Sequence, residues 1–222
     1  MSKKKQVKKV EVVNVEEIER QVVEPVIEIE KVVVQPYNQA VDVLQKAFVF
    51  FNEKLCNNEL DKVPVITIQS KGRRSAYGWF WDCTWKNGAD DQLRPEINIA
   101  AEYLSRSASN IMETLIHELA HMINAKRGAK DCNAAQYHNK KFKSTAEELG
   151  LTCEKMGAYG YAKTGLGERA KAIVDQFIEN NNCAVFDSFN RVDRKRQWRK
   201  VWTIPCEEDA KNEVKRIALE QN

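Results

Sequence analysis

The sequence is poor in histidine and lacks several features that identify other protein classes. Its 222 residues include three histidines, and no apolar run approaches the roughly 18–20 residues that a membrane-spanning helix needs. Lysines follow Met1, but no apolar segment comes after them, so we expect no secretory signal and no membrane partner. These absences favour an intracellular protein, cytoplasmic or associated with the nucleoid, and not a secreted one.

Closely spaced cysteine pairs are absent as well. The closest two of the six cysteines, Cys132 and Cys153, are 21 residues apart, which excludes a CxxC zinc knuckle or ribbon. Scattered thiols without an export signal are typical of a reduced, intracellular protein. The net charge is only +3, from 35 basic and 32 acidic residues, so total charge does not by itself indicate a nucleic-acid binder.

Composition divides the chain into three parts. Residues 1–37 are mostly Val, Glu and Lys without Gly or Trp, so we expect a disordered arm, with a strand over 10–34 as the alternative. Helical and strand patterns over 38–180 predict a single α+β domain. Residues 181–222 form a basic tail, in which a charged helix is expected at 207–219.

Apolar spacing predicts the elements of that domain. A leading amphipathic helix of about 20 residues begins near Asn38, and alternating β-branched or aromatic residues predict three strands. Asn110 and Glu113 have the spacing of a capping box and Gly128 supplies a stop, so a long helix is expected between them. The strands are expected at 63–69, 76–86 and 96–100, and two later helices at 142–149 and 170–178.

The histidines form a candidate metal site. His117 to His121 is an HExxH sequence, and residues four apart lie on one face of a helix, so both imidazoles can reach one metal ion. Glu118 would lie beside that ion and take a proton from a zinc-bound water, whose pKa the metal lowers to about 7. The resulting hydroxide would attack a carbonyl, and Glu118 would pass the proton to the leaving amine.

A catalytic zinc ion usually has three protein ligands and one open position. His138 is the natural third ligand because no other histidine remains, although it follows His121 by 17 residues, too far for the metzincin pattern. Glu147 or Glu148 could complete the site instead, and Cys132 is a more distant alternative. Imidazole ligands favour zinc among the common divalent metals.

The segment HELAHMINAKRG, followed after a loop by YHNKKFKSTAEELGL, resembles the SprT-like zinc metallopeptidase domain. The resemblance covers about residues 38–165 and implies a zincin-like fold, in which a small sheet packs with a leading helix and an HExxH helix. It also implies that the three histidines bind zinc and that Glu118 is the catalytic acid and base. The family includes Spartan-type proteases that degrade proteins crosslinked to DNA, and many members carry a C-terminal four-cysteine ribbon that this chain lacks.

Further residues are candidates for supporting roles in catalysis. Tyr161 or Tyr159 could donate a hydrogen bond to a tetrahedral oxyanion, although a packed or surface tyrosine is the simpler interpretation. Glu113 lies one turn before His117 and could orient its ring, but helix capping already accounts for it.

Basic residues are bunched although the total charge is small. Lysines and arginines at 126–130 and 140–143 would form a positive face beside the metal if they converge in space. In the tail, a basic stretch with tryptophan could contact phosphates and stack on unpaired bases, or it could simply be solvated. The residues of this stretch are Arg194, Lys195, Arg196, Trp198, Arg199 and Lys200.

The sequence therefore predicts a zinc-dependent endopeptidase that cleaves protein or peptide substrates, in particular DNA-associated or DNA-crosslinked proteins. The alternative is a nucleic-acid- or protein-binding module whose metal is purely structural, which would place a fourth protein ligand where the enzyme holds water. A zinc hydrolase that acts on a non-peptide amide is a third interpretation of HExxH.

Overall fold

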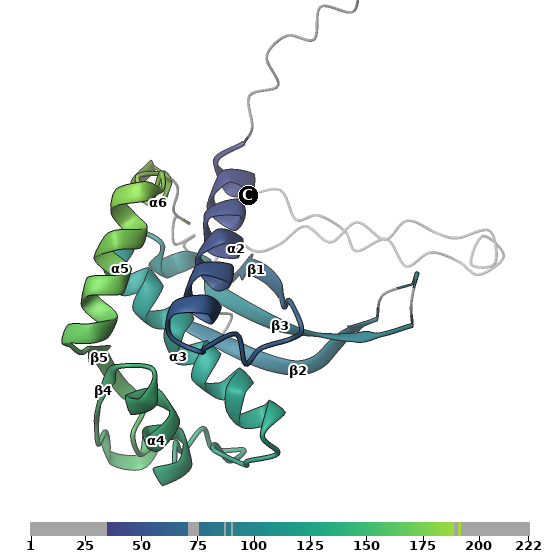
Figure 1. The fold of residues 1–222 in the computed structure, drawn as a ribbon, viewed down its shortest axis with the longest axis vertical. Helices are drawn as coiled ribbons and strands as arrows, with labels where there is room; N and C mark the ends of the chain where they lie inside the picture. The colour runs from purple at the N-terminus through teal and green to yellow at the C-terminus, as the bar shows by residue number, and fades with distance from the viewer. Residues whose placement is uncertain (1–34, 71–75, 87, 90, 189–190, 192–222) are drawn as a thin grey trace, which may run out of the picture. The chain divides into compact units, whose positions relative to one another are not determined.

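The computed structural model describes residues 35–70, 76–86, 88–89, 91–188 and 191. The predicted arm therefore lies almost wholly outside the described residues, as do the basic stretch of the tail and its expected helix. The described part contains helices and two small sheets, an α+β architecture as predicted (Figure 1). The elements are α2 (Pro36–Lys54), β1 (Val65–Gln69), β2 (Gly78–Lys86), β3 (Leu93–Ala100), α3 (Ala108–Lys126), α4 (Lys140–Glu148), β4 (Leu151–Glu154), β5 (Lys163–Leu166), α5 (Glu168–Asn180) and α6 (Val185–Ser188).

The larger sheet has three strands in the order β1-β3-β2, with β1 parallel and β2 antiparallel to β3. Side chains alternate across it, so Ile66, Ile97 and Ile99 are buried in the core. In β2 the register shifts between Trp81 and Trp85, which marks a β-bulge. The strand β3 begins at Leu93, earlier than the sequence pattern predicted.

The leading helix α2 begins at Pro36, where the fixed φ of proline suits a first helical turn. It buries Leu44, Phe48 and Phe51, which recur at helical spacing, and it contacts β1, α3 and α5. This packing places α3 inside the domain, with its apolar side chains buried and its histidine face turned toward α4.

The helix α3 is capped differently from the prediction. Its N-cap is Ser107, whose hydroxyl accepts a hydrogen bond from the backbone N–H of Asn110 at 3.3 Å. The prediction of a capping box at Asn110 and Glu113 is therefore wrong, because Asn110 already lies in the first turn of the helix. The predicted end of the helix at Gly128 is confirmed, since α3 ends at Lys126 and Gly128 has a φ of 66°, the left-handed conformation that terminates helices.

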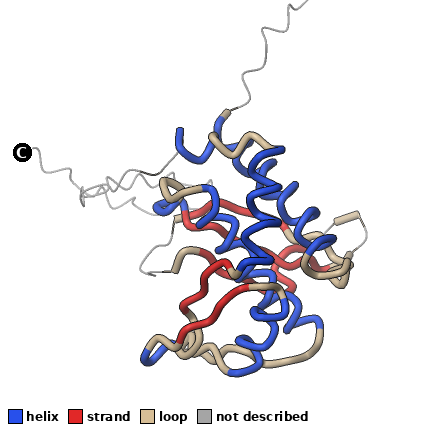
Figure 2. Tube along the Cα trace, turned by 60° about the vertical axis from the view of Figure 1, so that its left-hand side comes forward, coloured by secondary structure: helices blue, strands red, loops and turns tan. Residues whose placement is uncertain are grey.

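A second sheet, the antiparallel hairpin β4–β5, follows α4 and was not predicted from the sequence. It lies with α4 at one end of the domain, apart from the larger sheet (Figures 1 and 2). The core also continues beyond residue 180, where the sequence placed the end of the domain, because Val185 and Phe186 of α6 are buried and α6 contacts α2. Among the described residues, no helix has both the length and the apolar character needed to span a bilayer.

Candidate metal centre and catalytic site

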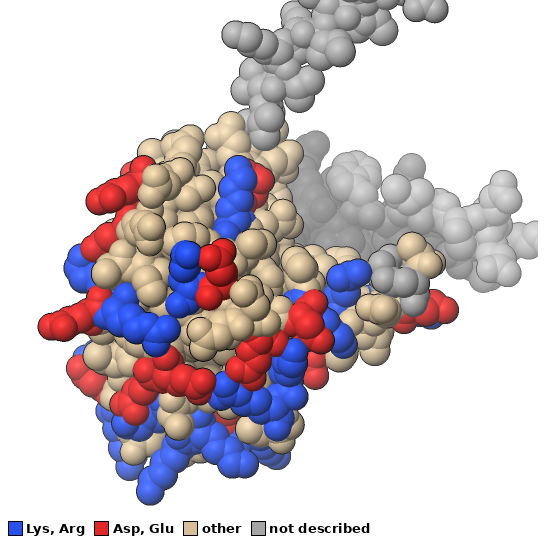
Figure 3. All heavy atoms as spheres, in the orientation of Figure 1, with Lys and Arg blue, Asp and Glu red and all other residues tan. Residues whose placement is uncertain are grey.

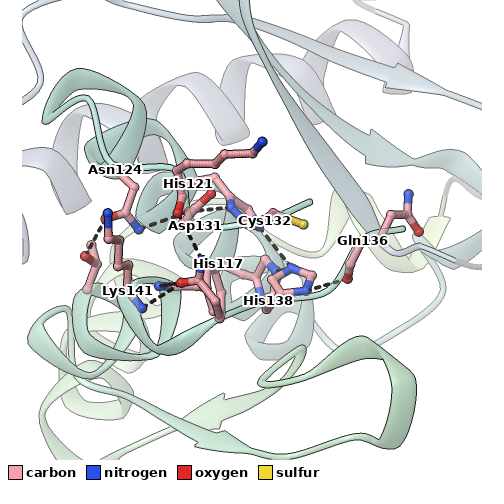
Figure 4. Close-up of polar contacts among 12 residues, drawn as sticks. His117, His121, Asn124, Asp131, Cys132, Gln136, His138 and Lys141 are labelled. Carbon is pink, nitrogen blue, oxygen red and sulfur yellow. Dashed lines mark hydrogen bonds and ion pairs between the residues drawn. The ribbon is translucent and has the colours of Figure 1, made fainter. Parts of the chain in front are cut away.

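Three imidazole rings meet in one place although they come from two segments. His117 and His121 lie one turn apart on α3, and His138 lies in the loop before α4 (Figure 4). The Nε2 atom of His138 is 3.3 Å from His117 Nε2 and 3.1 Å from His121 Nε2. One ligand atom from each ring lies within 4.8 Å of the others, so the three histidines could hold a metal ion. Three imidazoles form a donor set that suits zinc.

The ring of His117 is oriented by a hydroxyl group and a carboxylate. Thr164 Oγ1, on β5, lies 3.3 Å from His117 Nδ1 and donates to Glu113 Oε1 at 2.9 Å. A hydroxyl has one proton, so the Thr164 oxygen accepts from the Nδ1–H of His117, which leaves Nε2 unprotonated. Glu113 thus supports His117 through Thr164, the orienting role that the sequence pattern had ranked below capping.

The ring of His121 is held by a carboxylate that sequence reasoning missed. Asp131 Oδ2 accepts from His121 Nδ1 at 2.8 Å and from the side-chain amide of Asn124 at 3.0 Å. Asn124 Oδ1 in turn accepts from the hydroxyl of Thr145, on α4, at 2.8 Å. This chain of buried groups fixes the tautomer and orientation of His121. The only signal in the sequence is an aspartate in the loop between two histidines.

His138 is held by backbone pairing on both sides. Its N–H donates to the carbonyl of Tyr159 at 3.0 Å, and its carbonyl accepts from the N–H of Tyr161 at 3.0 Å. Its Nδ1 lies 3.0 Å from the carbonyl of Gln136, which can only accept, so Nε2 is again free to bind a metal. Gly160 has a φ of 65°, and a Cβ there would lie 2.1 Å from the His138 carbonyl oxygen, so only glycine fits.

Phe142 forms an apolar wall behind the rings. Its ring centroid lies 4.6 Å from that of each histidine, and its side chain is fully buried. Burial, together with the charge of His121, lowers the pKa of His138 to about 4, and burial holds the pKa of His117 well below its usual value. Both rings are therefore neutral near pH 7, the form that binds a metal.

Glu118 lies beside the histidines and faces β2. It is 4% exposed, and a Cβ built on Gly78 would lie 3.2 Å from its Oε1 atom, so the absence of a side chain at Gly78 makes room for the carboxylate. No described residue forms a hydrogen bond with this carboxylate. Burial raises the pKa of Glu118 to about 7, against the opposing charge of His121. A carboxyl group in this state can both accept and donate a proton near neutral pH.

The alternative metal ligands suggested by the sequence have other partners. Glu147 pairs with Lys143, and Glu148 pairs with Arg127 at 2.8 Å. Cys132 contacts a backbone carbonyl at 3.6 Å and is not part of the histidine cluster.

The proposed oxyanion donors hold His138 through their backbones, as described above. Tyr159 is 49% exposed, and Lys143 Nζ lies over the Tyr161 ring, 5.8 Å from its centroid. The tail residues expected to contact DNA lie outside the described residues.

Comparison with known families agrees with this geometry. A model of the SprT-like family matches residues 44–159, which include α3, all three histidines and Asp131. Neither the curated proteins nor the solved structures contain a match to the chain. The family match covers slightly more than half of the sequence, so the chain belongs to the SprT-like family.

Proposed function

We propose that the protein is a zinc-dependent endopeptidase. The observation that carries this proposal is the convergence of three imidazole Nε2 atoms next to Glu118, whose buried carboxylate has no hydrogen-bond partner among the described residues. When bound, a zinc ion supplies a Lewis acid that polarises a peptide carbonyl and acidifies water. The three histidines would hold the ion, and the hydrogen bonds that their Nδ1–H groups donate keep the rings in place before it binds.

Glu118 carries the proton transfers in this proposal. Its carboxylate would take a proton from the attacking water and later donate it to the leaving amine. Burial, which raises its pKa to about 7, keeps the two protonation states close in free energy, as both steps require. The absence of a side chain at Gly78 leaves room for this carboxylate between α3 and β2.

The surroundings favour catalysis over a purely structural metal. A structural zinc site is closed by a fourth protein ligand. In the described ranges, the cluster of ligand atoms contains only the three histidines. Asp131 accepts a hydrogen bond from His121, and Glu113 accepts one from Thr164, so neither carboxylate belongs to the cluster. The fourth position is thus left for water or substrate.

The edge of β2 supports an extended peptide as the substrate. The N–H of Ala100 donates to the carbonyl of Tyr77 at 2.8 Å, and in an antiparallel pair this places the N–H and C=O of Gly78 and Phe80 on the opposite edge. Among the described strands, β2 pairs only with β3. A peptide that adds to this edge as a further strand would pass directly beside Glu118. A small non-peptide amide would not need such an edge.

Basic residues around the site support DNA-associated proteins as substrates. Lys126, Arg127 and Lys143 are paired with carboxylates, but Lys130, Lys140 and Lys141 form no ion pair with the described residues. Figure 3 shows basic side chains gathered at the end of the domain that carries α4 and the β4–β5 hairpin. Such a surface could contact phosphates while a DNA-bound protein enters the site.

Metal analysis and cleavage of a DNA-binding protein, with and without DNA, test these proposals. Glu118→Gln should keep the metal and lose cleavage, whereas Glu179→Gln, an exposed control on α5, should retain both. Undiminished cleavage by Glu118→Gln would refute the mechanism. Neutralising the three unpaired lysines with glutamine should reduce stimulation by DNA but not cleavage of a free peptide. If stimulation is unchanged, this surface does not bind DNA.

A further inference from the structure

Arg106 is a half-buried cation beside the candidate site that neither holds the metal nor transfers a proton. It lies just before α3, in the segment that follows β3. Its Nε–H donates to the carbonyl of Tyr103 at 3.1 Å, and its Nη2 group donates to Thr114 Oγ1 at 2.9 Å. The guanidinium also stacks on Tyr77, with its Cζ atom 4.1 Å from the ring centroid. These three contacts fix the orientation of the guanidinium plane.

Most of the binding capacity of Arg106 is left unused by these contacts. A guanidinium has five N–H donors, and no described residue accepts from the remaining three or forms an ion pair with this group. Arg127, by contrast, pairs with two carboxylates. Burial lowers the pKa of Arg106, although an arginine stays protonated near pH 7. A partly dehydrated charge with free donors is well suited to bind a carboxylate.

Thr114 places this guanidinium on the face of α3 that carries the site. The residues of this face recur at intervals of three or four along the helix: Thr114, His117, Glu118 and His121. Thr114 precedes Glu118 by four residues, which is a rise of about 6 Å along the helix axis. Arg106 is therefore held about one helical turn from the carboxylate of Glu118, toward the start of α3.

The guanidinium also lies on the side of α3 that faces away from the core. Successive helical residues are about 100° apart, so Thr114 projects between Glu118 and the histidines of the helix. Leu115 and Leu119 project on the other side of Glu118 and are fully buried. Among the described strands β2 pairs only with β3, whose isoleucines belong to that core. The free edge of β2 therefore lies on the histidine side, where Arg106 is held.

Tyr77 places the same guanidinium at the start of β2. It directly precedes Gly78, where a Cβ would lie 2.9 Å from Thr114 Cγ2 and 3.2 Å from Glu118 Oε1. A peptide added to the free edge of β2 would thus pass Glu118 at Gly78 and Arg106 at Tyr77. Successive residues of a strand are about 3.3 Å apart, so the peptide residue that reaches Arg106 lies one or two positions from the cleaved bond.

The geometry of Arg106 favours an acidic side chain as its ligand. A planar guanidinium stacked on an aromatic ring presents its free N–H groups as a fork that matches the two oxygens of a carboxylate. Tyr77 is 51% exposed, so the ring that supports the guanidinium is open to an approaching peptide. A neutral amide of the same shape could accept only part of this fork and would bring no charge.

We propose that Arg106 is a specificity-determining residue, which binds the carboxylate of a substrate aspartate or glutamate one or two positions from the cleaved bond. The inference rests on the proposed peptidase function, and it adds a substrate preference that the three histidines and Glu118 do not set. Tyr77 and Thr114 act as positioning residues, because they hold the guanidinium at the site.

Pairs of fluorogenic peptides that differ only by Glu or Gln, at one position at a time, test this assignment. At one position within two residues of the cleaved bond, Glu should give a kcat/KM about tenfold or more above that for Gln. Arg106→Gln should bring this ratio close to one, whereas a merely structural arginine would affect both peptides equally and leave the ratio unchanged. The matched control Arg169→Gln alters an exposed arginine on α5 that donates to two backbone carbonyls, and it should keep the ratio.

Two results would overturn the assignment. The first is an equal kcat/KM for the Glu and Gln peptides with the unaltered protein, which needs no variant to fold. The second is an unchanged preference in Arg106→Gln when that variant retains its metal and its thermal unfolding transition. If this variant keeps the preference but binds a single-stranded oligonucleotide more weakly, the guanidinium contacts phosphate and not a substrate carboxylate.

Binding of the same peptides to the zinc-loaded Glu118→Gln variant separates this inference from the proposed function. If the unaltered protein cleaves no peptide but Glu peptides bind selectively, and Arg106→Gln removes the selectivity, the assignment of Arg106 stands and the peptidase proposal fails. If peptides are cleaved without any preference for Glu over Gln, the peptidase proposal stands and the assignment of Arg106 fails.

Discussion

Replacing Asp131 by asparagine should weaken metal binding without removing any metal ligand. The carboxylate accepts from His121 Nδ1 at 2.8 Å and from Asn124 at 3.0 Å through the same oxygen, Oδ2. An asparagine side chain has the same shape and can place its carbonyl oxygen there. What it loses is the negative charge that strengthens the Nδ1–H bond and makes Nε2 more basic.

The expected magnitude follows from this geometry. Loss of a carboxylate that orients a metal-ligating histidine typically costs 10- to 100-fold in metal affinity, which corresponds to about 1.4–2.8 kcal/mol. The upper part of this range is expected for Asp131→Asn because the side chains of His121 and Asp131 are only 12% and 13% exposed, so little water screens the interaction. One of the three rings is affected, so binding should be weakened and not abolished.

Competition for zinc with a chromophoric chelator measures this change directly. The control Asp175→Asn alters a partly exposed aspartate on α5 that pairs with Lys171, and its zinc affinity should equal that of the unaltered protein. Thermal unfolding of both variants without metal shows whether the fold is retained. A zinc affinity for Asp131→Asn within twofold of the control would refute the role assigned to Asp131.

Three further substitutions test the surroundings of the site. Phe142→Ala removes a fully buried ring and should lower the free energy of unfolding by about 3–5 kcal/mol, measured by urea titration of the metal-free protein. Thr145→Val should cost about 1–3 kcal/mol in the same titration because it leaves Asn124 Oδ1 without its donor, whereas equal stability would mean that the bond contributes little. Gly78→Ala places a methyl group 2.8 Å from the Asn98 carbonyl oxygen and should destabilise the domain by about 1–3 kcal/mol, with a lower kcat in a peptide-cleavage assay. A normal kcat for this variant would show that Glu118 does not need the space at Gly78.

The sequence predicts the elements that depend on local pattern. The helices at 36–54 and 108–126 and the strands of the larger sheet follow from spacing that any window of the chain displays. The helix start at Ser107 was missed because Ser107 and Asn110 are both good caps, and the choice between them depends on where the buried face of α3 begins. The hairpin β4–β5 was missed because each strand has only four residues and β5 contains a glycine, so the sequence shows almost no alternation there.

In the candidate site, too, the residues that follow from a local pattern were predicted and those that depend on the fold were not. HExxH is a local pattern, and His138 could be chosen because no other histidine remained. Thr164 and Asp131 could not be found in this way, because each meets its histidine only after α3, α4 and the hairpin have packed together. The groups that coordinate a metal are thus visible in the sequence, whereas the groups that orient them are a property of the fold.

The packing of α3 against α4 positions the metal-binding histidines. Asn124 and Thr145 link α3 to α4 through a buried hydrogen bond, and Phe142 on α4 packs against all three rings. The same contacts that join the two helices therefore also position the ligands. A site whose supports belong to the core can be in place before the metal arrives, so little free energy is lost in ordering the rings on binding. Metal affinity and domain stability should consequently fall together when this packing is disturbed. When only the charge of Asp131 is removed, metal affinity should fall while the domain keeps its stability.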